Sequence, residues 1–217
     1  MLPVSQVSMK MTARILKDGK SITATGELYY KVSGGGMVTR FITPSEYLVM
    51  TNSNGEFSIY NNKDNTVTQA QGRDYSSENS FIYYFLKNKT QDMGLGMAGF
   101  RLKDTKFEDN LMITTWDPPG ELSGSMTRAE LVQENYRPIF MGFYNDKGKP
   151  IQKVYYSKYE RVGDYSVPMS ITELQYIGKG DSVITKRVYS DVKMNEQVDA
   201  KWLNFRIPNN AKVIKQQ

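Results

Sequence analysis

The chain has no cysteine and no histidine among its 217 residues. Without cysteine it can form no disulfide and offers no thiolate nucleophile. Without histidine it lacks the usual general base and the commonest metal ligand. The two absences together exclude Ser-His-Asp and Cys-His catalysis and an ordinary zinc site. We therefore expect a protein that binds its target without catalysis, and that holds no metal ion and no cofactor.

Long apolar runs and concentrated charge are also missing. No apolar run approaches the roughly 18 residues that a membrane-spanning helix needs. The 28 basic and 23 acidic residues give a net charge of +5, and the basic residues are scattered. Nucleic-acid-binding proteins usually gather such residues into a patch or stripe. We expect neither a membrane span nor a nucleic-acid partner.

Short β-type runs separated by turn residues make up most of the sequence. The runs between residues 22 and 71 are rich in Val, Ile, Thr, Tyr and Phe, and Gly, Asn, Ser and Pro divide them. Asp18-Gly19 marks a hairpin turn after an alternating run. The sequence predicts strands at residues 7–16, 22–32, 37–42, 46–51, 56–60, 66–71, 101–106, 110–115, 128–133, 139–144, 151–161, 166–176 and 182–192, with a last extended segment at 202–213.

One segment breaks the strand pattern. Residues 76–87 fit a helix of about three turns that begins at a serine N-cap and ends at a lysine. The following residues, 88–98, predict a mobile apolar loop. Residues 94–99 match G-x-G-x-x-G, but a dinucleotide site needs a strand before the motif and a helix after it. The helix carries one apolar stripe, formed by Phe81, Ile82, Phe85 and Leu86.

These elements predict a mainly β (α+β) fold and a single domain over residues 1–217. The strands follow one another as one antiparallel meander, and a sheet of this size must curl or be covered. The helix is the natural cover for the concave side, and we expect it to act as a movable lid. The 12 Met, 15 Tyr and 9 Phe residues suit a surface that accepts varied apolar partners, or simply a core rich in Met and Tyr.

Four stretches of the sequence resemble a known family. They are Gly26-Glu27-Leu28-Tyr29-Tyr30-Lys31, the run from Asn54-Gly55 to Tyr60, the turn Asp146-Lys147-Gly148-Lys149-Pro150-Ile151, and the closing segment from Trp202 to Val213. Their patterns and their order are similar to those of the periplasmic lipoprotein carriers, the LolA-like family that includes outer-membrane lipoprotein-sorting proteins.

The resemblance implies an unclosed half-barrel, with helices as a lid over a hydrophobic cavity. It also implies a monomeric periplasmic carrier of a Gram-negative cell that binds the acyl chains of lipoproteins, or a related amphiphile. Its partners would include inner- and outer-membrane lipoprotein-sorting components. In the family an Arg-Pro follows the strand lysine, and that arginine is thought to bond the lid. Here Val32-Ser33-Gly34 follows Lys31, and Arg40 is the nearest basic substitute for the lid contact.

The expected ligand-binding residues are large apolar side chains of the inner strand faces, the lid and the loop after it. The alternative is a non-enzymatic envelope module that binds a protein through its sheet edge or its concave face. A hydrolase is disfavoured by the missing His and Cys. The candidate cavity and lid residues are Met9, Met11, Leu28, Tyr30, Phe41, Phe57, Ile59, Phe81, Ile82, Phe85, Leu86, Met93 and Met97.

Overall fold

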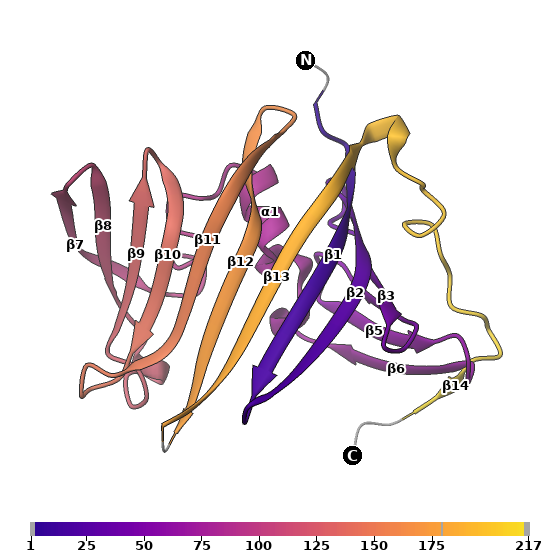
Figure 1. The fold of residues 1–217 in the computed structure, drawn as a ribbon, viewed down its shortest axis with the longest axis horizontal. Helices are drawn as coiled ribbons and strands as arrows, with labels where there is room; N and C mark the ends of the chain where they lie inside the picture. The colour runs from indigo at the N-terminus through magenta and orange to yellow at the C-terminus, as the bar shows by residue number, and fades with distance from the viewer. Residues whose placement is uncertain (1–2, 179, 215–217) are drawn as a thin grey trace.

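The computed structural model describes residues 3–178 and 180–214 (Figure 1). Its first strands are β1 (Gln6–Lys17), β2 (Lys20–Lys31), β3 (Met37–Thr43), β4 (Tyr47–Thr51), β5 (Glu56–Asn61) and β6 (Thr66–Gln71). The later strands are β7 (Arg101–Glu108), β8 (Leu111–Asp117), β9 (Arg128–Glu134), β10 (Arg137–Tyr144), β11 (Pro150–Val162), β12 (Tyr165–Gly178), β13 (Asp181–Met194) and β14 (Lys212–Val213). Each predicted strand is present, but only β14 forms within the last predicted segment.

The fourteen strands of the described residues belong to one sheet, in the order β14-β6-β5-β4-β3-β2-β1-β13-β12-β11-β10-β9-β8-β7. Every neighbouring pair is antiparallel except β14 and β6, which run parallel. β14 and β7 lie at opposite ends of this order, so the sheet is unclosed. The predicted mainly β half-barrel is confirmed.

The strand order differs from the single meander that the sequence predicts. β1 to β6 form one antiparallel meander and β7 to β13 form another, and the pairing of β1 with β13 joins the two. β6 and β7 are consecutive strands in the chain, yet they lie near opposite edges of the sheet. Local alternation cannot reveal this arrangement, because it shows which face a residue occupies and not which distant strand is its neighbour.

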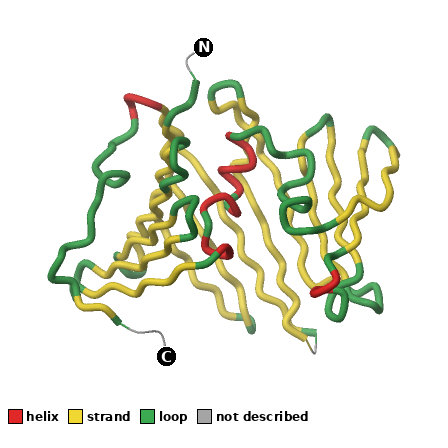
Figure 2. The backbone as a smooth tube through the Cα atoms, turned by 180° about the vertical axis from the view of Figure 1, so that it is seen from behind, coloured by secondary structure: helices red, strands yellow, loops and turns green. Residues whose placement is uncertain are grey.

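Residues 72–100 connect β6 to β7 and therefore cross the inner face of the sheet (Figure 2). They form 3₁₀ turns at Arg73–Tyr75 and Ser77–Asn79, then helix α1 (Phe81–Leu86). The predicted three-turn helix is wrong in length, because two serines cap separate turns. The Ser76 side chain accepts a hydrogen bond from the backbone N–H of Glu78, and the Ser80 side chain accepts one from that of Tyr83.

Helix α1 packs into the centre of the inner face. Phe81 lies against Tyr189, with ring centroids 4.7 Å apart. Phe85 lies between Tyr156 and Tyr159, at centroid distances of 6.1 and 6.0 Å. We call the buried cluster around α1 the inner core. Strands from both meanders contribute to it, with Met9, Met11, Leu28, Tyr30, Leu131, Val154, Tyr156, Val167, Met169 and Tyr189 among its members.

A second apolar cluster covers the opposite, outer face of the first meander. Residues 198–211, which we call the C-terminal strap, run beside β3 to β6 before β14 (Figure 1). The strap residues Trp202, Leu203 and Phe205 pack against the cluster that contains Tyr29, Leu48 and Tyr60. Because Tyr29 alternates along β2 with the inner-core residues Leu28 and Tyr30, this half of the sheet is covered on both faces.

Because the strap packs over one leucine and leaves another exposed, we expect mutation of the two to change the free energy of unfolding by different amounts. Leu48 is 4% exposed beneath the strap, whereas Leu16 is 38% exposed. We expect Leu48→Ala to lower the free energy of unfolding by about 2–5 kcal/mol, because it leaves a cavity in a packed cluster. The control, Leu16→Ala, should lower it by less than about 1 kcal/mol. Urea unfolding measures both, and equal losses would show that the strap does not bury Leu48.

Candidate functional site: an apolar groove on the inner face

The structure buries eight of the expected ligand-binding residues together in the inner core. Phe41 and Phe81 are partly buried against the same cluster. These side chains converge as expected, but α1 fills the space between the strands, so they form a packed interior in place of an open cavity. The eight buried residues are Met9, Met11, Leu28, Tyr30, Ile82, Phe85, Leu86 and Met93.

Three expected residues lie outside the inner core. Phe57 is half-buried on β5 and stacks on Tyr75 of the crossing segment, with ring centroids 4.9 Å apart. Ile59 is half-buried two residues further along the same strand. Met97 is 62% exposed, at the rim of an inner-face groove.

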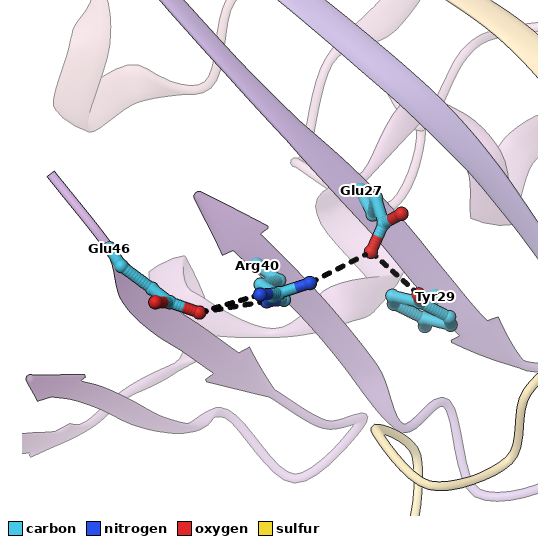
Figure 3. Close-up of polar contacts among 4 residues, drawn as sticks. All are labelled: Glu27, Tyr29, Arg40 and Glu46. Atoms are coloured by element: carbon cyan, nitrogen blue, oxygen red, sulfur yellow. Dashed lines mark hydrogen bonds and ion pairs between the residues drawn. The ribbon is translucent and has the colours of Figure 1, made fainter. Parts of the chain in front are cut away.

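Arg40, the expected lid contact, lies on the outer face of β3, the face that the C-terminal strap covers. Figure 3 shows its guanidinium between the carboxylates of Glu27 and Glu46. Its Nη2 is 2.7 Å from Oε1 of Glu46 and its Nη1 is 3.5 Å from Oε2 of Glu27. The guanidinium carbon lies 4.6 Å from the ring centroid of Trp202 in the strap. The hydrogen bond to Glu46 raises the pKa of Arg40 above its usual value. Arg40 therefore binds the C-terminal strap in this structure.

The open apolar space is a groove of about 980 Å³ at the β7 end of the inner face. Its floor is formed by β7, β8 and β9, and its wall by Tyr84 of α1 and by the loop that follows. The floor is continuous because Leu102 pairs with Trp116 across β7 and β8, and Met112 pairs with Gln133 across β8 and β9. The groove is lined by Tyr84, Asn88, Lys89, Thr90, Gln91, Asp92, Gly94, Met97, Leu102, Thr105, Met112, Thr114, Trp116, Gln133 and Tyr136.

The loop that walls the groove is folded into consecutive turns and anchored by its own side chains. Met93 and Leu95 are buried in the inner core. Asp92 accepts hydrogen bonds from the backbone N–H groups of Gly94 and Gly96, each at 3.0 Å. Gly94 has φ +83°, and a Cβ there would lie 2.4 Å from the hydroxyl oxygen of Tyr84. Only glycine allows this close approach of the Tyr84 ring to the loop.

Another hollow has the wrong chemistry for an alkyl chain. It has a volume of about 450 Å³ on the outer face of β7 to β10. Lys103 pairs there with Asp117 at 3.1 Å, and the Arg128 guanidinium lies 4.3 Å from the Tyr144 ring centroid. In the described part of the chain, no three carboxylates cluster closely enough to hold a metal ion. None of the helices in that part has the length and apolar character needed to cross a membrane.

Sequence reasoning named Met97 but missed the rest of the apolar lining. The alternation of Met112, Thr114 and Trp116 along one strand could have placed them on one face. The alternation could not show that this face is left open, because the segments that cover the rest of the inner face are distant in the sequence. The missed apolar residues are Tyr84, Leu102, Met112, Trp116 and Tyr136.

The sheet curls around a short helical crossing segment and leaves a groove at one end, which defines an open antiparallel half-barrel. More particularly, the fold is LolA-like, as the sequence motifs implied. A LolA superfamily protein from Nitrosomonas europaea aligns over 93% of this chain and 91% of its own, with a TM-score of 0.59 and 12% identity.

Two further solved structures share the fold. A DUF1329 family protein from Desulfovibrio piger has a TM-score of 0.61 at 13% identity and aligns over 93% of this chain and 90% of its own. A domain from Vibrio parahaemolyticus described as an outer membrane lipoprotein-sorting protein has a TM-score of 0.59 at 16% identity, over 92% and 89% of the two chains. No protein-family model matches this sequence, and neither does any curated protein sequence. These identities establish the fold alone.

Tyrosines buried in the inner core make the free energy of unfolding depend on pH in the alkaline range. Burial raises the pKa of Tyr30 and of Tyr189 to about 12, whereas an unfolded tyrosine ionises near about 10. The stabilisation from the neutral hydroxyls is therefore complete below about pH 10 and is lost as the pH rises towards 12. We expect the free energy of unfolding, measured in urea at pH 8, 10 and 11, to fall across this window.

The variant Tyr30→Phe should flatten this fall. It should also cause no loss of stability at pH 8, because the buried Tyr30 hydroxyl has no hydrogen-bond partner among the described residues. The same pH dependence in the variant and in the wild type would contradict the contribution of Tyr30.

Proposed function

We propose that this protein is a non-catalytic periplasmic carrier that binds the acyl chain of a lipoprotein, or a related amphiphile, for sorting to the outer membrane. The observation that carries the proposal is the apolar groove on the inner face of a LolA-like half-barrel. A solved structure with the same fold is described as an outer membrane lipoprotein-sorting domain, which supports the proposed ligand class. The groove volume of about 980 Å³ lies at the upper end of the range usual for small-molecule sites.

The driving force is the transfer of methylene groups from water into the groove. Each buried methylene contributes about 0.8 kcal/mol, so eight of them would contribute about 6 kcal/mol. That free energy corresponds to a dissociation constant in the range of roughly tens of micromolar. Leu102, Met112 and Trp116 would contact the chain along the floor, and Met97 would cover it from the loop.

A larger cargo would need the space that α1 now occupies. The helix has only six residues, and the four side chains of its apolar stripe pack on the inner core. Displacing α1 would expose Met9, Met11, Leu28 and Tyr30, and the groove and the inner core would become one continuous apolar surface. In this proposal α1 is the lid, and its return to the closed position assists release.

A second candidate function is protein binding through the β7 edge. All eight residues of β7 are exposed, and Phe107 is 76% exposed. An edge strand with unpaired backbone groups can accept an extended segment of another protein. In that case the partner would occupy the edge, and free amphiphile would bind poorly.

Tryptophan fluorescence tests the carrier proposal at the groove itself. The chain has two tryptophans, Trp116 in the groove and Trp202 in the strap. We expect monolaurin to change the emission of the Trp202→Phe variant saturably, because Trp116 would contact the acyl chain. The matched Trp116→Phe variant, which keeps only Trp202, should show little change. A response from Trp202 alone, or no response from either variant, would contradict binding in the groove.

The variant Phe85→Glu tests whether α1 moves as a lid. Phe85 is buried against Tyr156 and Tyr159, so a carboxylate there is costly while the helix is closed. If α1 opens readily, the charge can reach water, and we expect a modest fall in melting temperature together with strong loss of amphiphile affinity. In a fixed helix the same change should destabilise the fold by several kcal/mol.

Thermal unfolding and the affinity for a two-chain phospholipid, measured on this one variant, separate the two cases, because a one-chain probe can occupy the groove without displacing α1. Severe destabilisation, combined with full hydrogen-exchange protection of α1 in the unliganded wild-type protein, would rule out the lid.

A further inference from the structure

Of the described residues, Lys89 is the one basic residue that lines the groove, and it lies at the groove wall. Its Nζ donates a hydrogen bond to the hydroxyl oxygen of Tyr83 at 2.6 Å and lies 4.8 Å from the Tyr83 ring centroid. The backbone N–H of Lys89 donates to the carbonyl oxygen of Tyr84 at 2.8 Å. The residue is therefore held at both its main chain and its ammonium group, directly after α1.

The two charged side chains that line the groove differ in their partners. Among the residues that line it, only Lys89 and Asp92 are charged. Both carboxylate oxygens of Asp92 are occupied by the N–H groups of Gly94 and Gly96. The ion pairs formed within residues 3–178 and 180–214 do not include Lys89. The hydrogen bond to Tyr83 raises the pKa of Lys89, so the ammonium stays charged at neutral pH.

We propose that Lys89 is the head-group site of the groove and that it selects a long-chain monocarboxylate, with the alkyl chain lying over Leu102, Met112 and Trp116. The inference rests on the proposed carrier function and names the ligand class of that same groove. The Lys89 ammonium can donate a charge-assisted hydrogen bond to one carboxylate, and the three apolar floor residues would contact one extended chain. Tyr83 is a positioning residue, because its hydroxyl and its ring hold the ammonium at the groove wall.

The expected size of the effect follows from the exposure of Lys89. A hydrogen bond between two charged groups is stronger than a neutral one, but solvent weakens ion pairs at the surface. Lys89 is exposed. Removing its charge should therefore weaken carboxylate binding by about three- to tenfold, and should leave binding of a neutral chain nearly unchanged.

The test uses three probes with the same twelve-carbon chain: laurate, dodecanol and dodecyltrimethylammonium. Binding is followed at pH 8 by Trp116 emission in the Trp202→Phe background. Among the three probes, we expect laurate to bind most tightly to the protein that retains Lys89. The Lys89→Met substitution should lower the affinity for laurate three- to tenfold and change the affinity for dodecanol less than twofold. Lys89→Arg should retain laurate binding. Lys87→Met is the matched control, because Lys87 is an exposed lysine of the same segment that does not line the groove.

Other outcomes overturn the inference in distinguishable ways. If Lys89→Met weakens laurate and dodecanol equally, or if Lys87→Met matches it, Lys89 is not a head-group site although the groove still binds chains. If all three probes bind the unmodified Lys89 protein equally, the carrier proposal stands and the selectivity is wrong. If none of the probes binds, both the carrier proposal and the head-group site are overturned.

Discussion

The pairing of β1 with β13 is the constraint on which the rest of the structure depends. It runs from Val7 opposite Met194 to Leu16 opposite Ile184, and it joins two strands from opposite ends of the chain. Because β1 and β13 each have a neighbour on both sides, the two meanders must grow outwards from this seam. β6 and β7 are then left near opposite edges, and the segment between them has to cross the sheet. The crossing segment that supplies α1 is thus a consequence of strand topology.

The position of the crossing explains why one end of the inner face stays open. Residues 72–100 cover the centre, where α1 meets strands of both meanders. The outer strap adds a second cover, but only behind β2 to β6. The strap does not reach the β7 end, so the inner-face residues there are covered only at one side, by Tyr84 of α1 and by the loop around Gly94. An apolar floor with cover on one side is a groove, and its open side coincides with the exposed strand β7.

Register shifts and a close contact between strands help the sheet to curve around α1. The register of β2 against β3 shifts between Thr25 and Gly26, and the pairing of β1 with β13 shifts between Ser8 and Lys10. A Cβ at Gly26 would lie 2.3 Å from the carbonyl oxygen of Arg40. Such irregularities bend the strands that carry them. They occur near the seam, where the two halves of the sheet must wrap around α1.

The sequence predicted the strands and the fold class because both depend on local alternation and on turn chemistry. Asp18 and Gly19, for example, adopt φ values of +51° and +71°, as a two-residue hairpin turn requires. The seam and the groove could not be predicted in this way. Arg40 looked like a lid contact because it stands close in sequence to Lys31, but strand alternation places it on the outer face, opposite Trp202. The short helix was also missed, because an N-capping Ser80 competes with continuation of the helix from Ser76.

Both the inner core and the groove can bury apolar groups. The free energy of burying the α1 side chains, compared with that of burying an acyl chain, shows which of the two a ligand would occupy. Four side chains of the α1 stripe, at about 1.5–3 kcal/mol each, contribute about 6–12 kcal/mol while they stay buried. At about 0.8 kcal/mol per methylene, that equals the burial of roughly 8–15 methylene groups, or about one long acyl chain. A ligand with one chain therefore gains nothing by displacing α1 and is best accommodated in the groove. A cargo with a second chain would offset the displacement, so the number of chains decides whether α1 remains core or becomes a lid.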